Sequence, residues 1–450
     1  RLEERPVSPS ADPPYDAGLP ILAELEGLVR RHAVAAEEAR LRNAPLHRAV
    51  VVAFGKPLPK DTSADVLKRR IFEQATHSWL HAMDTLPSLP CAWIKSVKRR
   101  PGAPAVADTL GSALSAGQAL TGSLLIAKRL MRHSAQEPVV GVLLPTSSAG
   151  VLANMATLLA GKTLVNLNYT ASQEALAFAL QQAEVRTLLT SQRFVTRLEQ
   201  RGLDVTPLLT SLRVLYLEDL QASMTRRKRL MTWLAVRCLP GWLLQTLFCR
   251  AQDANATAAI LFSSGSEGMP KGVMLSHRNL MANIKQTSDV LNTQHDDVVM
   301  ASLPTFHAFG FTVTQLLPLV EGLPLVCHAD PTDVSGVAKA VSQHQATIMF
   351  GTSSLLRLFN RHPKVQAEQL HSLRIVVAGA PPPTRTIERV GEVLGWQFNQ
   401  IYGLTETAPL LTINRARAEW DDLPSDERAK LLGRAGVPAL GVRMDVDPTG

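Results

Sequence analysis

The segment FSSGSEGMPKG, residues 262–272, directly follows the apolar run AAIL at residues 258–261. Residues 263–272 contain three glycines, three serines and one lysine. Glycines let the backbone approach a ligand closely, and successive N–H groups with serine hydroxyls can bind an anion. Lys271 adds a positive charge. A Gly/Ser-rich stretch can be a plain surface turn, but its position after a buried strand favours a phosphate-binding loop.

The order of residues in this loop excludes two common nucleotide-binding patterns. A Walker-type loop would have Gly where Pro270 stands and Ser or Thr where Gly272 stands. The GxGxxG pattern of dinucleotide-binding proteins is absent as well. The loop therefore indicates a third way of holding phosphate.

Apolar runs of strand length alternate with helical stretches on both sides of the loop. The expected strands are residues 139–144, 163–167, 185–190, 214–217, 258–262, 298–301, 325–326, 347–350 and 375–378. Such alternation predicts an α/β fold with layered, largely parallel sheets flanked by helices. Continuous apolar strands indicate that both faces of a sheet are covered. Residues 87–105 are basic and contain prolines, so we expect a connector there.

Composition limits the class of protein. The chain has 450 residues, 46% of them hydrophobic, and a formal net charge of +8. This is typical of a globular protein of two or three domains. Cations gather at residues 95–100 and 226–229, but no aromatic-interleaved motif accompanies them, so no nucleic-acid partner is expected.

Three further segments have residue types that suit a binding site. They are LPTFHAFG at residues 303–310, VVAGAP at 376–381 and QIYGLTET at 400–407. Each also has a plain structural interpretation: a packed core histidine, a strand-to-helix turn and a helix cap.

Taken in this order, the loop and the three segments resemble the adenylate-forming (AMP-binding) superfamily. The usual form of its loop is Thr-Ser-Gly-Ser/Thr-Thr-Gly-x-Pro-Lys-Gly. Glu267 replaces a threonine here, which resembles the branch of bifunctional 2-acylglycerophosphoethanolamine acyltransferase/acyl-acyl-carrier-protein synthetases. The resemblance implies the large N-terminal domain of that fold, with the start of a small β-barrel subdomain near residues 432–446.

The resemblance also implies which residues bind ATP and Mg²⁺. Residues implied to contact the nucleotide are Ser263, Ser264, Gly265, Ser266, Gly268, Lys271, Gly379, Ala380, Tyr402, Gly403 and Thr405. Gly379 and Ala380 would form a backbone ledge, and Tyr402 would stack on adenine. Glu406 would hold the metal.

Four residues are implied to support catalysis: Lys271, His307, Thr405 and Glu406. Thr405 would bind the α-phosphate, and His307 would border the acyl pocket. Amino-acid-activating relatives place an aspartate at the position of His307. Its absence favours a carboxylic acid without an α-amine, because a buried ammonium would have no partner.

The implied function is ATP-dependent activation of a fatty acid to an acyl-adenylate, followed by transfer to acyl-carrier protein. A long-chain fatty-acid–coenzyme A ligase is the alternative within the same class. A ribose-binding aspartate and a catalytic lysine, which the family has farther along, do not occur before residue 450. We therefore expect a fragment with poor adenylation activity, or a nucleotide-binding module.

Residues 1–85 differ from the rest of the chain. VVVAFGKPL at residues 50–58 resembles the tail of a phospholipid acyltransferase domain, although that family's His-x4-Asp motif is absent. We therefore expect an acyltransferase-like remnant at 1–85 and an AMP-binding domain, incomplete at its C-terminus, at 86–450. The link to phospholipid turnover implies a cytoplasmic location at the inner face of the cell membrane.

Residues 226–249 are expected to form a helix pair with a basic start and an apolar face. Such a pair suits a membrane surface. A core-packing helical hairpin explains the same pattern equally well.

Overall fold

The computed structural model describes residues 55–56, 58–59, 61–250, 253–263, 270–379, 397–415, 423–432 and 434–444. The expected acyltransferase-like tail therefore lies largely outside the described residues. The described residues all belong to the unit Val51–Gly450.

The larger sheet has nine strands, six of them parallel. Its spatial order is β15-β14-β13-β12-β11-β9-β10-β1-β2, and β14, β15 and β2 run antiparallel to their neighbours. The bounds are β1 (Pro104–Asp108), β2 (Ala113–Ser115), β9 (Val299–Ala301), β10 (Leu325–Cys327), β11 (Ile348–Thr352), β12 (Ile375–Gly379), β13 (Gln397–Gly403), β14 (Leu410–Arg415) and β15 (Val437–Pro438).

The second sheet has six strands in the order β6-β5-β3-β4-β7-β8. All neighbours are parallel except β7 and β8, which form an antiparallel pair at one edge. The bounds are β3 (Val139–Leu143), β4 (Thr163–Asn166), β5 (Thr187–Thr190), β6 (Arg213–Tyr216), β7 (Thr257–Ser263) and β8 (Lys271–Ser276). The two sheets confirm the predicted α/β fold of layered, largely parallel sheets.

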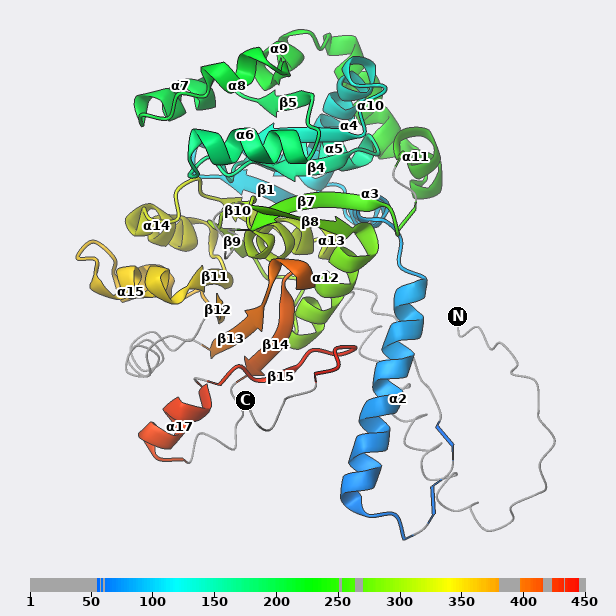
Figure 1. Cartoon of the computed structure of the whole chain (residues 1–450), viewed down its shortest axis with the longest axis vertical. Helices are drawn as coiled ribbons and strands as arrows, with labels where there is room; N and C mark the ends of the chain where they lie inside the picture. Colours follow the sequence, from blue (N-terminus) through cyan, green and yellow to red (C-terminus); the bar gives the residue numbers. More distant parts are fainter. Residues whose placement is uncertain are drawn as a thin grey trace, which may run out of the picture. The chain divides into compact units, whose positions relative to one another are not determined.

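Helices separate most of these strands (Figure 1). The α-helices are α2 (Ala64–Asp84), α3 (Leu89–Arg99), α4 (Ala116–His133), α5 (Ser148–Leu159), α6 (Gln173–Gln182), α7 (Gln192–Gln200), α8 (Thr206–Thr210), α9 (Leu217–Ala222), α10 (Arg226–Cys238), α11 (Gly241–Phe248), α12 (His277–Leu291), α13 (Leu317–Glu321), α14 (Val334–His344), α15 (Ser353–Arg361) and α17 (Ser425–Leu432). Shorter or tighter turns are η1 (Gly310–Leu316), η2 (Ala367–Leu370) and η3 (Thr405–Thr407).

Two hydrophobic cores cover opposite faces of the six-stranded sheet. The larger one joins α3, α4, α5 and α12 to strands of both sheets. The smaller one contains side chains of β3, β4 and β5 with those of α6 and α7, such as Leu176, Leu188 and Leu198. Burial on both faces explains why these strands read as continuous apolar runs in the sequence.

Residues 87–105 are not a simple connector. Residues 89–99 form α3, whose apolar side chains, including Trp93 and Ile94, are buried in the larger core. Pro90 stands near the start of this helix, where a missing N–H removes no helical hydrogen bond. The prolines and basic residues therefore mark the two ends of a helix, not an extended linker.

The expected helix pair at residues 226–249 forms as α10 and α11. Among the helices that the structure describes, none has the length and apolar character needed to cross a bilayer. Most of α10 is exposed, and only Thr232 and Val236 are buried in it. Trp233 of α10 and Trp242 of α11 lie at the surface, while Val236 and Leu244 are buried in the larger core. The pair therefore packs on the core and also exposes large apolar side chains.

Candidate functional site

The predicted phosphate-binding loop connects β7 and β8. Ser263 pairs with Lys271 at the end of this hairpin, and Phe262 pairs with Gly272. A Cβ on Gly272 would lie 3.2 Å from side-chain atoms of Phe262 and Ile260, so a larger residue would be crowded there. Ser263 and Lys271 therefore flank the loop as predicted. Four predicted residues within it lie outside the described residues: Ser264, Gly265, Ser266 and Gly268.

The other three segments gather at one edge of the nine-stranded sheet. The neighbouring strands β9, β11, β12 and β13 run parallel, so their carboxyl ends lie at the same edge. The segment with His307 follows β9, Gly379 ends β12, and Thr405 comes just after β13. In open α/β sheets ligands bind at this edge. Ala380 lies outside the described residues.

Phe309 brings the His307 segment close to β12. A Cβ on Gly379 would lie 3.5 Å from the ring of Phe309, which is ordinary contact distance. Phe309 also packs edge-on against Phe350 of β11, with 5.7 Å between ring centroids. The backbone at Gly379 is therefore next to an aromatic side chain that lies two residues from His307.

A π-helix follows the His307 segment. It spans Gly310–Leu316, and every residue in it is buried. A Cβ on Gly310 would overlap the carbonyl group of Pro304, so the chain can make this approach only with glycine. Such wide turns are rare and occur often at functional sites. The sequence predicted the segment but gave no sign of this helix type.

His307 is exposed, and its ring lies next to that of Phe306, with 4.6 Å between the ring centroids. Loss of water around the ring lowers its pKa. The neutral form is therefore favoured at neutral pH. Phe306 in turn contacts Tyr169, whose burial raises its pKa to about 12. These aromatic contacts hold the segment in place.

The end of β13 and the turn after it expose two polar side chains that the sequence predicts to bind the nucleotide and the metal. Tyr402 is 47% exposed, and Glu406 is exposed too. A Cβ on Gly403 would overlap the carbonyl oxygen of Pro409, so glycine is required where the chain folds back into β14. Thr405 and Glu406 then form the turn η3, and the Thr407 hydroxyl donates to the Pro409 carbonyl at 2.7 Å.

The β7–β8 hairpin, which carries the predicted phosphate-binding loop, lies next to the turn η3. β8 contacts η3, so the second strand of the hairpin and the segment with Thr405 and Glu406 are neighbours. Helix α12 continues directly from β8, so the hairpin, this helix and η3 are close to one another (Figure 1). Lys271 and Glu406 are exposed, and neither forms an ion pair among the described residues.

Asn283 links helix α12 to the segment that follows Glu406, and this residue was not predicted from the sequence. This buried residue of α12 donates to the carbonyl oxygens of Thr407 at 3.2 Å and Leu410 at 2.9 Å. Its side-chain oxygen accepts the N–H of Leu410 at 3.1 Å. One side chain therefore fixes the chain just after Glu406 to the helix that follows the phosphate hairpin. A polar residue on the apolar face of α12 was the available signal.

The residues of this candidate site suit a nucleoside triphosphate with a divalent cation. Exposed Lys271 can pair with phosphate, and the Tyr402 ring is open for stacking. The Glu406 carboxylate is a hard oxygen ligand of the kind that Mg²⁺ prefers. Among the described residues no group of three or more His, Cys, Asp or Glu side chains could hold a metal. Phosphate oxygens and water are the usual further ligands of a protein-bound Mg²⁺.

Comparison with known proteins finds one matching family model and a set of similar ligases. A family model described as AMP-binding enzyme matches residues 93–450. The 4-hydroxybutyrate–CoA ligase 2 of Metallosphaera sedula is 29% identical over 296 residues, which cover 64% of this chain and 51% of that protein. A long-chain-fatty-acid–CoA ligase of Salmonella typhimurium is 30% identical over 165 residues, 36% of this chain and 29% of that protein. The chain thus spans about half or less of these relatives.

Solved structures share the fold. The o-succinylbenzoate coenzyme A synthetase of Bacillus subtilis in complex with ATP and magnesium ion has a TM-score of 0.62 at 21% identity, covering 79% of this chain and 65% of that one. The anthranilate CoA ligase AuaEII in complex with anthranoyl-AMP has a TM-score of 0.67 at 18% identity, with 82% and 67% covered. At these identities the likeness establishes the fold alone.

Proposed function

The chain belongs to the AMP-binding enzyme family, and on that premise we propose that it is the adenylate-forming part of an acid–thiol ligase. The proposed reaction joins a fatty acid to the α-phosphate of ATP, releases pyrophosphate, and then transfers the acyl group to a thiol with release of AMP. The protein needs no nucleophile of its own for either step. Its task is to align the reactants and to offset negative charge.

One observation carries the proposal most strongly. The β7–β8 hairpin that holds the phosphate-type loop contacts the turn that holds Thr405 and Glu406. Two segments far apart in the sequence, each suited to phosphate or to a cation, therefore meet in space. The contact between β8 and η3 supports a shared site, because each element borders a segment whose residue types suit phosphate or a cation.

The chemistry of each residue suggests its role in the proposed reaction. Lys271 would neutralise charge on the β- and γ-phosphates, and the loop N–H groups and the hydroxyl of Ser263 would donate to their oxygens. Thr405 would donate to the α-phosphate. Tyr402 would stack on adenine, and the backbone at Gly379 would border the purine. Glu406 would hold a magnesium ion, whose charge would offset the negative charge that develops on the phosphates.

The acid substrate is proposed to lack an α-amine. The position after Phe306 carries His307, whose lowered pKa favours the neutral form. A neutral ring offers no negative charge to an ammonium group, and burial of an unpaired ammonium is costly. The long-chain-fatty-acid–CoA ligase of Salmonella typhimurium among the relatives supports a fatty acid.

The acceptor thiol is proposed to be that of acyl-carrier protein. Glu267, in the loop outside the described residues, supports this choice through the resemblance to acyl-acyl-carrier-protein synthetases. Coenzyme A is the second candidate, and the names of the relatives favour it.

We also propose that residues 1–85 come from a phospholipid acyltransferase-like domain, with the AMP-binding domain at 86–450. Both would act in the cytoplasm at the inner face of the membrane.

The test uses the complete polypeptide with a panel of carboxylic acids. Fatty acids are expected to drive exchange of labelled pyrophosphate into ATP, whereas α-amino acids of similar length should not. Thioester formation is then measured with acyl-carrier protein and with coenzyme A in parallel. Exchange with amino acids only would contradict the proposed substrate, and thioester formation with coenzyme A alone would replace the carrier protein.

A further inference from the structure

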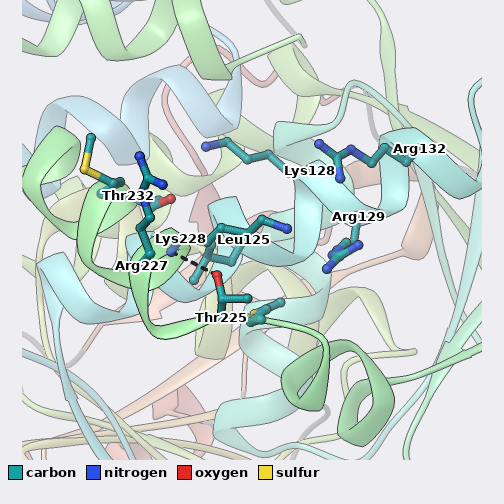
Figure 2. A pocket seen from close by; sticks show the side chains of 10 residues that line it. Leu125, Lys128, Arg129, Arg132, Thr225, Arg227, Lys228 and Thr232 are labelled. Carbon is teal, nitrogen blue, oxygen red and sulfur yellow. Dashed lines mark hydrogen bonds between the residues drawn. The ribbon is translucent and has the colours of Figure 1, made fainter.

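Helices α4 and α10 line a pocket whose lining contains no acidic residue. The pocket has a volume of about 510 Å³. Its lining residues are Leu125, Lys128, Arg129, Arg132, Met224, Thr225, Arg227, Lys228, Met231 and Thr232. Five of these ten residues are cations and none is an acid, and Figure 2 shows that the cations come from both helices.

The cations around the pocket lack carboxylate partners. None of the five forms an ion pair with an acidic residue in the part of the chain that the structure describes. Arg129 donates to the carbonyl oxygen of Ser223 at 2.8 Å, and the Lys128 ammonium lies 4.6 Å from the ring centre of Phe248. These contacts position the side chains but leave their charge uncompensated. An anion would relieve the repulsion between them.

Exposed apolar side chains stand beside these cations. Leu230, Trp233 and Leu234 of α10 are 55%, 43% and 38% exposed, and their spacing puts them on one face of the helix. On α11, Trp242 is 67% exposed. Large apolar side chains next to a basic cluster are typical of helices that lie in a membrane interface, where tryptophan is especially common.

We propose that the pocket between α4 and α10 binds the phosphate headgroup of an anionic phospholipid, while Trp233 and Trp242 enter the interface of the same bilayer. A pocket of this volume suits a small ligand or a headgroup. A folded acidic protein could pair with the cations, but it would gain little from a cavity it cannot enter. The site is separate from the nucleotide site and does not depend on the proposed ligase activity.

The experiment measures co-sedimentation of the protein with vesicles. Phosphatidylcholine vesicles with phosphatidylglycerol should bind the protein, and pure phosphatidylcholine vesicles should bind it weakly. The pocket variant carries Arg132→Gln, Arg227→Gln and Lys228→Gln. Each cation near an anionic surface contributes roughly fivefold to partitioning, so the variant should partition about 100-fold less.

A charge-matched control carries Arg193→Gln, Arg197→Gln and Lys339→Gln. These are exposed cations of α7 and α14, so the control loses the same net charge away from the pocket. It should retain most of its binding. Equal loss in the two variants would overturn the proposal, because it would reduce the effect to overall charge.

A second pair of variants tests the tryptophans. One double variant carries Trp233→Ala and Trp242→Ala, and its control carries Leu110→Ala and Leu358→Ala at other exposed apolar positions. The tryptophan pair should weaken vesicle binding about tenfold or more, since two large side chains leave the interface. A final arm offers soluble acyl-carrier protein in place of vesicles. Binding to that protein through the pocket cations, with no binding to anionic vesicles, would also overturn the proposal.

Discussion

His277 makes stability depend on pH. It is 2% exposed and is the first residue of α12, where the positive end of the helix disfavours a second positive charge. Burial lowers its pKa from 6.5 to about 4, although the charge of Asp253 opposes the change. Protonation therefore favours the unfolded chain. The free energy of unfolding should be steady above pH 7 and fall by roughly 3 kcal/mol between about pH 6.5 and 4.

His277→Gln should flatten that part of the profile, because the variant has no group to protonate there. The matched control is His371→Gln, which removes an exposed histidine. Urea unfolding of the three proteins at several pH values between 7 and 4 measures the slopes. A His277→Gln slope equal to that of the unmodified protein would show that other groups cause the pH dependence.

Asn283 is expected to be a positioning residue. Asn283→Ala leaves the Leu410 N–H and two carbonyl groups without the partners described above, which should cost about 2–4 kcal/mol of stability. Because the segment after Glu406 loses its anchor on α12, the KM for ATP in pyrophosphate exchange should also rise about tenfold. A structural role alone would lower the amount of folded enzyme without changing KM.

The control for this variant is Asn414→Ala. Asn414 is a buried asparagine of β14 that donates to the Leu431 carbonyl at 2.6 Å, away from the turn that carries Glu406. It should lose stability but keep the KM for ATP. A comparable rise in the KM for ATP in both variants would show that Asn283 has no specific role in positioning the site.

At the scale of the elements, two glycines that the sequence singled out should respond differently to alanine. Gly403→Ala puts a methyl group into the Pro409 carbonyl where β13 folds back into β14. The chain must move there, so we expect a loss of about 2–4 kcal/mol and weak ATP binding. Gly379→Ala puts its methyl at ordinary contact distance from Phe309.

Gly379→Ala should therefore fold with a change within about 1 kcal/mol. Thermal unfolding and ATP titration of the two variants provide the comparison. Equal tolerance at both positions would mean that the β13–β14 turn has another conformation.

The elements themselves were predictable where local pattern decides them. The strands at residues 139–144, 258–262 and 375–378 were identified from apolar runs, because burial on both faces leaves an unmistakable composition. Helix α3 was missed because Pro90 and the basic residues at its end resemble a linker. The π-helix was missed because helix type depends on packing around Gly310, which no periodicity reveals.

At the scale of the whole molecule, sequence reasoning found the parts of the site but not how they meet. Ser263, Lys271, His307, Gly379 and Tyr402 lie at the hairpin or at the carboxyl edge of the larger sheet. The contact between β8 and η3 joins separate sheets, and no local pattern predicts it. The basic pocket could not be predicted either, because it forms from two segments far apart in the sequence. The cations of α4 have no distinctive motif, and only their position beside α10 makes them part of a pocket.

The contact between β8 and η3 leads to the central claim, that both segments serve one site. The hairpin supplies Lys271, and the edge of the other sheet supplies Glu406, so the removal of either should disable the same reaction step. Glu406 is exposed and belongs to no core, so its replacement by Gln should leave the fold intact. The same holds for exposed Lys271.

The most direct test is fatty-acid-dependent exchange of pyrophosphate into ATP by the complete polypeptide. It compares the unmodified protein with Glu406→Gln, with Lys271→Gln and with the charge control Lys339→Gln. We expect strong exchange in the unmodified protein and in the control, and a loss of at least about 100-fold in each site variant, which corresponds to roughly 3 kcal/mol of transition-state stabilisation. Undiminished exchange in Glu406→Gln and Lys271→Gln would contradict the account.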